Sequence, residues 1–291
     1  MHRRRFLAAV AATVVAACAP GSSGGALRRL ASATRLPFPY GDHPQQVADL
    51  WLPTRPDPDR RPVVVLVHGG YWRPGFDRHL MQDLAVDVVE RGWAAWNVDY
   101  RPSGPGGGGW PGTFADVATG IDGLADAATR HRIDPDRVVV VGHSAGGCLA
   151  LWAAARPGLP EDAPGAAPRV QMLAAASQGG VNDLRSAVAA DLGQGAVTAL
   201  MGAGPDEDPE RYALASPAER LPLNLPQVLV HGTKDIVVPR WQSSDYANKA
   251  VQTGDDATLL TIEGADHFEL IDPAHRAWRA LVERLAPFLD S

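Results

Sequence analysis

The stretch VVVVGHSAGGCLALWAAA at residues 138–155 constrains the fold more than any other part of the sequence. Its four valines predict a buried strand, and the residues after Gly147 predict a helix. Between them, Gly142, Ser144 and Gly146 fit the pattern G-x-S-x-G, in which a strand turns sharply into a helix and presents the serine at the turn. The alternative is a plain structural turn in a chain of 30 glycines. The remaining sequence has to distinguish these two interpretations.

Short apolar runs alternate with helical patterns from residue 60 onward. Strands are predicted at residues 63–67, 93–100, 138–141, 170–175, 227–231 and 258–263, with the weakest signal at 170–175. Helices are predicted at residues 79–91, 114–131, 145–155 and 274–289. This alternation predicts an α/β fold in which helices flank both faces of a mostly parallel central sheet.

Residues 183–221 interrupt the alternation with short helical patterns and the turn-rich stretch GAGPDEDPE. Two interpretations of this segment are open. It is either a small cap over a site or a solvated helical crossover between two strands.

A serine hydroxyl needs a base to take its proton and an acid to orient that base. Asp235 in HGTKDIVVP and His267 in GADHF each follow a predicted strand. We therefore expect both side chains at the same carboxyl edge of the sheet as Ser144. Asp183 is an alternative acid, although it equally suits the N-cap of a helix beginning at residue 184.

The sequence HGGYW at residues 68–72 directly follows a predicted buried strand. Glycines allow a close backbone approach, and backbone N–H groups can stabilise the negative charge that develops on a carbonyl oxygen. The alternative is an ordinary Gly-Gly exit from a strand. The candidate oxyanion-hole donors are Gly69, Gly70 and Ala145. The candidate substrate contacts are Tyr71, Trp72 and Trp110, the last of these in a glycine-rich loop at residues 104–112.

Five motifs occur in the order HGGYW, DYR at 99–101, DPDRVVVVGHSAGG at 134–147, HGTKDIVVP at 231–239 and GADHF at 264–268. Together they resemble the α/β-hydrolase fold, and within it the esterase and lipase branch with an HGG oxyanion motif. The form HGGYW is similar to the group of kynurenine formamidases and bacterial feruloyl-esterase-like proteins. The resemblance covers residues 60–285. The glycine-rich loop departs from it, because such proteins usually carry a proline-rich loop there.

The resemblance implies a Ser–His–Asp acyl-enzyme mechanism without a metal or organic cofactor. By position it implies Ser144 as nucleophile, His267 as base, Asp235 as the orienting acid, and Gly70 with Ala145 as oxyanion donors. It specifies the fold and the triad more closely than the substrate.

The first 36 residues differ from the rest in composition. A basic start at residues 3–5 is followed by an apolar run that is too short to span a bilayer comfortably. A basic zone followed by an apolar zone is typical of an export signal. The sequence RRRFL at residues 3–7 also resembles the twin-arginine export motif. Cys18, where the apolar run ends, resembles the lipidated cysteine of a bacterial lipobox. We expect an export signal at residues 1–18, a flexible tether at 19–36 and the catalytic domain at 37–291.

Two localisations follow from this interpretation. A lipid on Cys18 would anchor the protein to the outer face of the cytoplasmic membrane, whereas cleavage at a nearby small-residue site would leave a soluble secreted protein. A buried N-terminal helix is disfavoured because the run has no amphipathic period.

The net charge of −6 gives no electrostatic reason to expect nucleic-acid binding. Cys148 is the only cysteine beyond residue 18, so the expected mature domain has no internal disulfide and a packed thiol. No Cys/His spacing typical of a metal site occurs, and nothing in the sequence indicates an oligomeric state.

Three functions fit these features. The first is hydrolysis of small or aromatic carboxylic esters. The second is hydrolysis of the formamide N-formylkynurenine, which the HGGYW motif favours and an export signal disfavours, because that substrate belongs to cytosolic tryptophan breakdown. The third is a noncatalytic surface protein that binds ligands on a hydrolase scaffold, because a fold alone does not guarantee activity.

Overall fold

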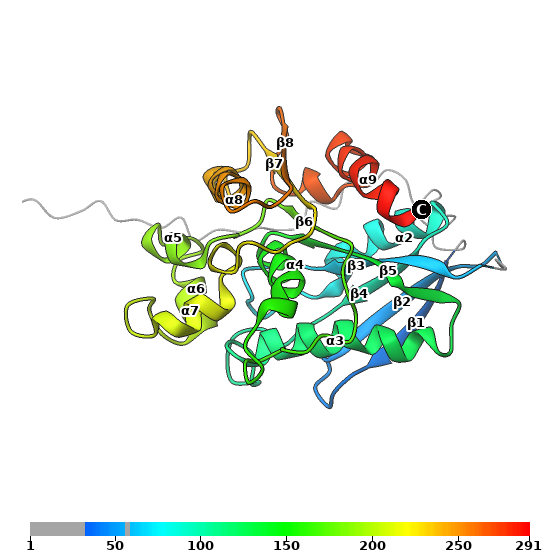
Figure 1. Cartoon of the computed structure of the whole chain (residues 1–291), viewed down its shortest axis with the longest axis horizontal. Coiled ribbons are helices and arrows are strands. Elements are labelled where there is room, and N and C mark those ends of the chain that lie inside the picture. Colours follow the sequence, from blue (N-terminus) through cyan, green and yellow to red (C-terminus); the bar gives the residue numbers. More distant parts are fainter. Residues whose placement is uncertain (1–32, 56–58) are drawn as a thin grey trace, which may run out of the picture.

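Eight strands form a single sheet in the computed structural model, which describes residues 33–55 and 59–291 (Figure 1). The strands are β1 (Ala33–Pro39), β2 (Val47–Pro53), β3 (Arg61–Val67), β4 (Ala94–Val98), β5 (Ile133–His143), β6 (Ala174–Gln178), β7 (Gln227–Gly232) and β8 (Ala257–Ile262). Their order across the sheet is β1-β2-β4-β3-β5-β6-β7-β8, with β1 and β2 antiparallel to their neighbours. The predicted mostly parallel sheet is confirmed.

The apolar runs in β3 and β5 serve two cores at once. Val63, Val65 and Val67 belong to one hydrophobic cluster, whereas Val64 and Leu66 belong to the other. Side chains alternate across a strand with a period of two, so a continuous apolar run suits a strand covered on both faces.

Helices cover both faces of the sheet, as predicted (Figure 1). The helices α3 (Gly112–Ala128), α4 (Ala145–Ala155) and α8 (Trp241–Gln252) contribute to one core, and α2 (Gln82–Glu90) and α9 (Arg276–Leu289) to the other. Every residue of α4 is buried, which matches its uniformly apolar sequence. Four short 3-10 helices complete the elements: η1 (Arg78–Met81), η2 (Arg156–Gly158), η3 (Pro217–Glu219) and η4 (Glu269–Ile271).

Residues 183–221 form three short helices between β6 and β7, on the left of Figure 1. These are α5 (Leu184–Ala189), α6 (Ala196–Met201) and α7 (Pro209–Ala215). Leu184, Val197 and Leu200 are buried in the same core as α3 and α4, so the segment is not a solvated crossover. The Arg73 side chain donates hydrogen bonds to the carbonyls of Gly193 and Gln194, which joins this segment to the HGGYW loop.

Two expectations differ from the structure, and several elements were not predicted. The strand expected at 170–175 lies at Ala174–Gln178, because its buried centre consists of alanines and the larger apolar residues precede it. Strand β1 begins at Ala33, so the last four residues of the expected tether (19–36) are strand. Strand β2 and helix α8 were not predicted.

The expected export signal, Cys18 and the first part of the tether lie outside the described residues. Within residues 33–55 and 59–291, none of the helices is both long enough and apolar enough to cross a membrane.

Candidate active site

Ser144 occupies a sharp turn between β5 and α4, with φ 56° and ψ −121°. Residues other than glycine seldom adopt a positive φ. A Cβ on Gly142 would lie 1.9 Å from the carbonyl oxygen of Gly146, and one on Gly146 would lie 2.2 Å from that of Val67. The backbone N–H of Ser144 donates to the carbonyl of Gln178 at 2.8 Å. The glycines therefore allow strand and helix to approach closely enough for the turn, which is the strand–turn–helix arrangement predicted for G-x-S-x-G.

Asp235 and His267 form a direct hydrogen bond at the carboxyl edge of the sheet. His267 Nδ1 lies 2.6 Å from Asp235 Oδ2, and the two side chains are 4% and 0% exposed. Asp235 Oδ1 accepts hydrogen bonds from the backbone N–H groups of Val237 and Val238 at 2.9 Å each. Because a carboxylate only accepts, this arrangement assigns the proton to His267 Nδ1 and leaves Nε2 as a free acceptor.

Several contacts lower the pKa of the Asp235 carboxyl. Burial alone would raise that pKa, but hydrogen bonds from His231 and His267, the charge of His267 and the N–H of Val238 outweigh burial. Asp235 is therefore a carboxylate over the physiological pH range.

His231 is a second histidine on the same carboxylate, and the sequence analysis missed it. Its Nε2 lies 3.3 Å from Asp235 Oδ2 and 2.9 Å from the carbonyl oxygen of Val238. A carbonyl only accepts, so Nε2 carries the proton, and Nδ1 accepts from the Ser243 hydroxyl at 2.8 Å. The signal was present, because His231 is the last residue of the predicted strand at 227–231 and stands four residues before Asp235.

His143, which precedes Ser144, forms a hydrogen bond with the backbone of His267. Its Nε2 lies 3.0 Å from the carbonyl oxygen of His267, and the two ring centroids are 4.6 Å apart. Burial, and then the neighbouring His267, lowers the pKa of His143 to about 3. The ring therefore stays neutral, and its Nδ1 is buried without a hydrogen-bond partner.

The end of β6 lies between the serine and the acid–base pair. Gln178 accepts the Ser144 N–H, and a Cβ on the next residue, Gly179, would lie 3.1 Å from both Asp235 Oδ2 and His267 Nδ1. Among the described residues the Ser144 hydroxyl has no hydrogen-bond partner. Such serine–histidine bonds are commonly long before substrate binds. The structure thus gathers Ser144, Asp235 and His267 at one sheet edge.

The HGGYW loop packs its first glycine directly on the serine. A Cβ on Gly69 would lie 2.9 Å from both the Ser144 Cβ and the carbonyl oxygen of His143. Gly70 has φ +115°, and Tyr71 and Trp72 continue with positive φ angles, so the loop bends back tightly at this point. Ala145 is the first residue of α4, where backbone N–H groups lack helical acceptors and the helix dipole is positive. These positions suit the predicted oxyanion-hole donors.

The first two residues of the DYR motif, Asp99 and Tyr100, contact His68 at the start of this loop. Asp99 Oδ1 lies 3.0 Å from His68 Nε2, and Asp99 Oδ2 accepts from Arg78 at 2.9 Å. The Tyr100 ring stacks on the His68 ring at 4.2 Å, and its hydroxyl donates to the His68 carbonyl at 2.8 Å. The residue before the glycines is therefore fixed by buried polar contacts.

Comparison with known proteins identifies the family. The profile of the BD-FAE family matches residues 48–250. The chain belongs to the BD-FAE family. The matched range contains Ser144 and Asp235 and ends before His267, so the placement of His267 in the site rests on the geometry described above.

Two curated relatives are similar over most of this chain. Esterase LipQ of Mycobacterium tuberculosis is 31% identical over 276 residues, which cover 91% of this chain and 64% of LipQ. Esterase LipC of the same organism is 29% identical, covering 86% of this chain and 64% of LipC. The chain thus spans less than two thirds of the length of these relatives.

Solved structures share the fold. Esterase B from Lactobacillus rhamnosis superposes with a TM-score of 0.76 at 19% identity, covering 91% of this chain and 90% of that one. A truncated carbohydrate esterase from gut microbiota gives a TM-score of 0.74 at 20% identity, covering 89% and 97%. These similarities show that the BD-FAE chain has the predicted α/β-hydrolase fold.

The three aromatic side chains expected to contact substrate differ in position. Trp72 is 1% exposed and belongs to the hydrophobic core, and its contact with substrate stays a prediction. The Tyr71 hydroxyl donates to the carbonyl of Val237 at 2.8 Å, which links the HGGYW loop to the loop after Asp235. Trp110 is partly buried, contacts Phe114 edge-on, and donates its backbone N–H to Leu200 of α6.

Two other expectations are settled by contacts. Asp183 accepts the backbone N–H groups of Arg185 and Ser186 at the start of α5, so it is a helix cap and not the acid of the site. Cys148 is buried in α4, and burial raises its thiol pKa, as expected for a packed, unreactive thiol. Within the described parts of the chain, no group of three His, Cys, Asp or Glu side chains is placed to hold a metal ion.

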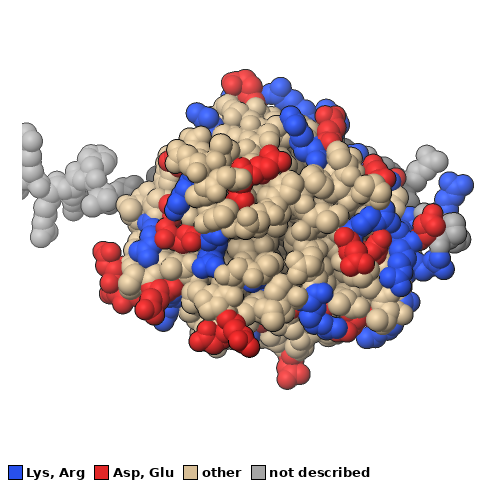
Figure 2. Space-filling view, in the orientation of Figure 1, with Lys and Arg blue, Asp and Glu red and all other residues tan. Residues whose placement is uncertain are grey.

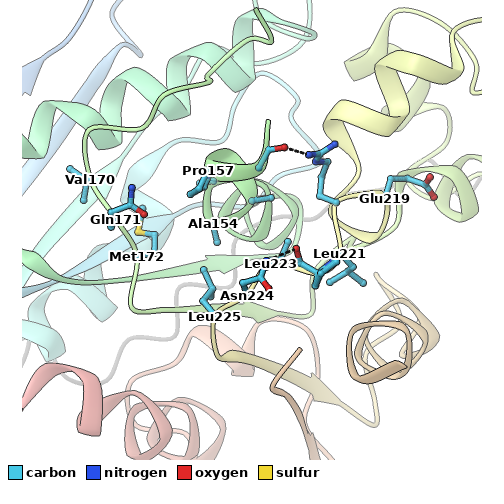
Figure 3. Close-up of a pocket in the computed structure, with 15 residues that line it drawn as sticks. Ala154, Pro157, Val170, Gln171, Met172, Glu219, Leu221, Leu223, Asn224 and Leu225 are labelled. Atoms are coloured by element: carbon cyan, nitrogen blue, oxygen red, sulfur yellow. Dashed lines mark hydrogen bonds between the residues drawn. The ribbon is translucent and has the colours of Figure 1, made fainter. Parts of the chain in front are cut away.

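A cavity of about 610 Å³ lies at the opposite end of α4 from the serine (Figure 3). Its lining includes Ala154 of α4, Met172, and the segment from Leu221 to Leu225. None of the predicted site residues lines this cavity. On the face drawn in Figure 2, acidic and basic side chains interleave around an area that is largely uncharged.

Proposed function

We propose that this BD-FAE family member hydrolyses carboxylic esters through an acyl-enzyme formed on Ser144. The observation that carries this proposal is the 2.6 Å bond between His267 and Asp235 beside a serine held in a strained strand-to-helix turn. Two relatives that are esterases by name, LipQ and LipC, support the reaction class.

In the proposed reaction, Ser144 Oγ attacks the acyl carbon while Nε2 of His267 accepts its proton. Asp235 holds the ring in the required tautomer and stabilises the imidazolium that forms. The backbone N–H groups of Gly70 and Ala145, with Gly69 packed beside them, stabilise the oxyanion, and one such donor is typically worth about 3–4 kcal/mol of barrier. Protonated His267 then gives its proton to the leaving alcohol, and water hydrolyses the acyl-enzyme by the same route.

The test is turnover of p-nitrophenyl acetate and p-nitrophenyl butyrate by the purified protein, with Ser144→Ala as the decisive variant. We expect kcat/KM to fall by at least about 10⁴-fold in the variant, because no other described group can form the acyl-enzyme. Circular dichroism should show an unchanged fold. Full activity of Ser144→Ala would overturn the mechanism.

N-formylkynurenine belongs in the same assay, because the HGGYW motif resembles that of arylformamidases. Formamide turnover that exceeds ester turnover would replace the ester assignment with the formamidase one. Absence of turnover with every ester and formamide would favour a noncatalytic ligand-binding role.

We further propose export with lipid attachment at Cys18, supported by the basic, apolar and small-residue zones of residues 1–25. The expected results are partition of the mature protein into detergent and a mass that includes acyl chains on Cys18. A Cys18→Ser protein that remained equally membrane-bound would contradict lipidation at Cys18.

A further inference from the structure

Exposed large apolar side chains are rare on the described surface, and three of the four adjoin residues of the proposed site. Four such residues are exposed: Phe76 (43%), Ile236 (96%), Val251 (57%) and Phe268 (51%). The first, second and fourth each adjoin one of the proposed catalytic parts, whereas Val251 lies on α8. Because exposed apolar surface has no stabilising role in the free protein, a cluster of it points to a ligand.

Phe268 and Ile236 flank the acid–base pair. Phe268 follows the base, and its ring lies edge-on to the His267 ring with centroids 5.4 Å apart. Ile236 follows Asp235, and its side chain is almost fully in solvent although the residues on either side are held by hydrogen bonds. Asp235 and His267 bond directly to each other. Ile236 and Phe268 therefore each adjoin one member of the same hydrogen-bonded pair.

Phe76 covers the oxyanion loop. A Cβ on Gly70 would lie 2.3 Å from the Cγ of Phe76, so the aromatic side chain rests directly on this glycine. One part of Phe76 thereby shields the loop, and 43% of the residue faces solvent. Apolar surface therefore borders the oxyanion loop as well as the acid–base pair.

The charged side chains near this surface indicate which ligand charge it favours. Asp266, next to the base, is exposed, and its Oδ1 accepts the backbone N–H groups of Phe268 and Glu269. Cations are exposed nearby as well, Lys234 next to Asp235 and Arg73 next to the oxyanion loop, so charges of both signs border this surface. The surface suits a neutral molecule with a hydrocarbon group.

We propose that Phe76, Ile236 and Phe268 form an apolar rim that binds the hydrocarbon part of a neutral ester. The preferred substrates are then esters whose acyl group extends several carbons beyond the carbonyl. This inference rests on the proposed ester hydrolysis and adds a substrate class to it. Each rim residue acts by covering apolar substrate surface, which lowers KM more than it changes kcat.

The experiment compares kcat/KM for p-nitrophenyl octanoate and p-nitrophenyl acetate, both below their solubility limits. The wild type should prefer the octanoate. Ile236→Ser should lower the octanoate-to-acetate ratio of kcat/KM by about fivefold, through a higher KM. The reason is that the substitution removes roughly half of the apolar surface that one side chain would bury against the substrate. Ile236→Leu should retain the ratio, and Phe268→Ser combined with Ile236→Ser should lower it further.

Val251→Ser is the matched control, since it removes an exposed apolar side chain from α8 and should leave the ratio unchanged. An unchanged ratio in both rim variants, or an equal fall in Val251→Ser, would overturn the rim. A preference that appears only when the octanoate forms aggregates would also overturn it, in favour of binding to a lipid surface.

The rim and the proposed function fail in different ways. If the ester function is wrong, the wild type has no Ser144-dependent turnover of the acetate. If only the rim is wrong, acetate turnover persists and the octanoate preference does not depend on Ile236 or Phe268.

Discussion

The two ends of α4 present opposite kinds of surface. At the N-terminal end, backbone atoms of β3, β5 and α4 approach so closely that Gly142 and Gly146 have no room for a Cβ. At the C-terminal end lies a cavity of about 610 Å³ with two charged residues in its lining, Glu219 and Arg220, which form no ion pair with each other. The proposed site therefore lies where polar groups converge on a strained turn, and not where the most space is available.

The largest expected effect is that of Asp235→Asn at the N-terminal end. The amide would keep its oxygen toward Val237 and Val238 and turn its NH₂ toward His267, which selects the wrong tautomer of the base. We expect kcat to fall by about 10⁴-fold.

Glu219→Gln makes the same carboxylate-to-amide change beside the cavity. Glu219 pairs with Lys249 at 3.7 Å on the surface, so activity should stay within twofold of wild type. Equal losses in the two variants, measured with p-nitrophenyl acetate, would erase the distinction between the ends.

A pair of glycine substitutions tests the packing difference. The methyl group of Gly146→Ala would meet the carbonyl oxygens of Val67 and His68 at 2.2 and 2.3 Å, and should lower the free energy of unfolding by about 3 kcal/mol. In Gly158→Ala, at the other end, the nearest atom is 3.7 Å away, on the Arg220 guanidinium. Urea denaturation should show a change below about 1 kcal/mol for this second variant. A stable Gly146→Ala protein would show that the turn can widen.

The buried histidine beside the serine predicts a pH dependence of stability. The pKa of His143 is lowered to about 3, below its ordinary value of about 6.5, so the unfolded chain takes up a proton that the folded protein does not. Its contribution to the free energy of unfolding therefore falls by about 1.4 kcal/mol per pH unit as the pH drops from 6.5 toward 3.

His143→Gln keeps an N–H donor for the His267 carbonyl and removes this titration. Its stability should decline less steeply than that of wild type between pH 6 and pH 4. The exposed His79, replaced in the same way, supplies the control. Parallel stability curves for wild type and His143→Gln would contradict the neutral buried state.

The smallest effect belongs to the cavity. Met172→Trp would fill part of it, and kcat/KM should remain within twofold of wild type, because the cavity shares no residue with the proposed site. A large loss of activity would instead show that the two ends of α4 are coupled through the helix.

The elements that could be predicted from the sequence are those in which a local apolar pattern predicts that the side chains are buried. The valine runs of β3 and β5 and the uniformly apolar sequence of α4 each predict a buried element without any other information. Strand β6 was misplaced because alanines, with little β-propensity, form its buried centre. Helix α8 was missed because its sequence is largely polar, with a narrow apolar stripe.

The candidate site divides in the same way. Ser144, Asp235 and His267 could be predicted because each follows a strand with a recognisable motif. The contacts of His231 and His143 could not, since they depend on which loops meet in space. The burial of Trp72 could not be predicted for a related reason, because no local sequence pattern separates a core position from a binding position for an indole beside a loop.

The bond between the Tyr71 hydroxyl and the Val237 carbonyl joins residues 166 positions apart in the chain. A loop at a sheet edge is fixed only where its own strand ends, so neighbouring loops can fluctuate independently. This bond makes the loop with the oxyanion donors and the loop with the acid move together. We therefore expect the separation of these two loops to vary less than the position of either loop alone.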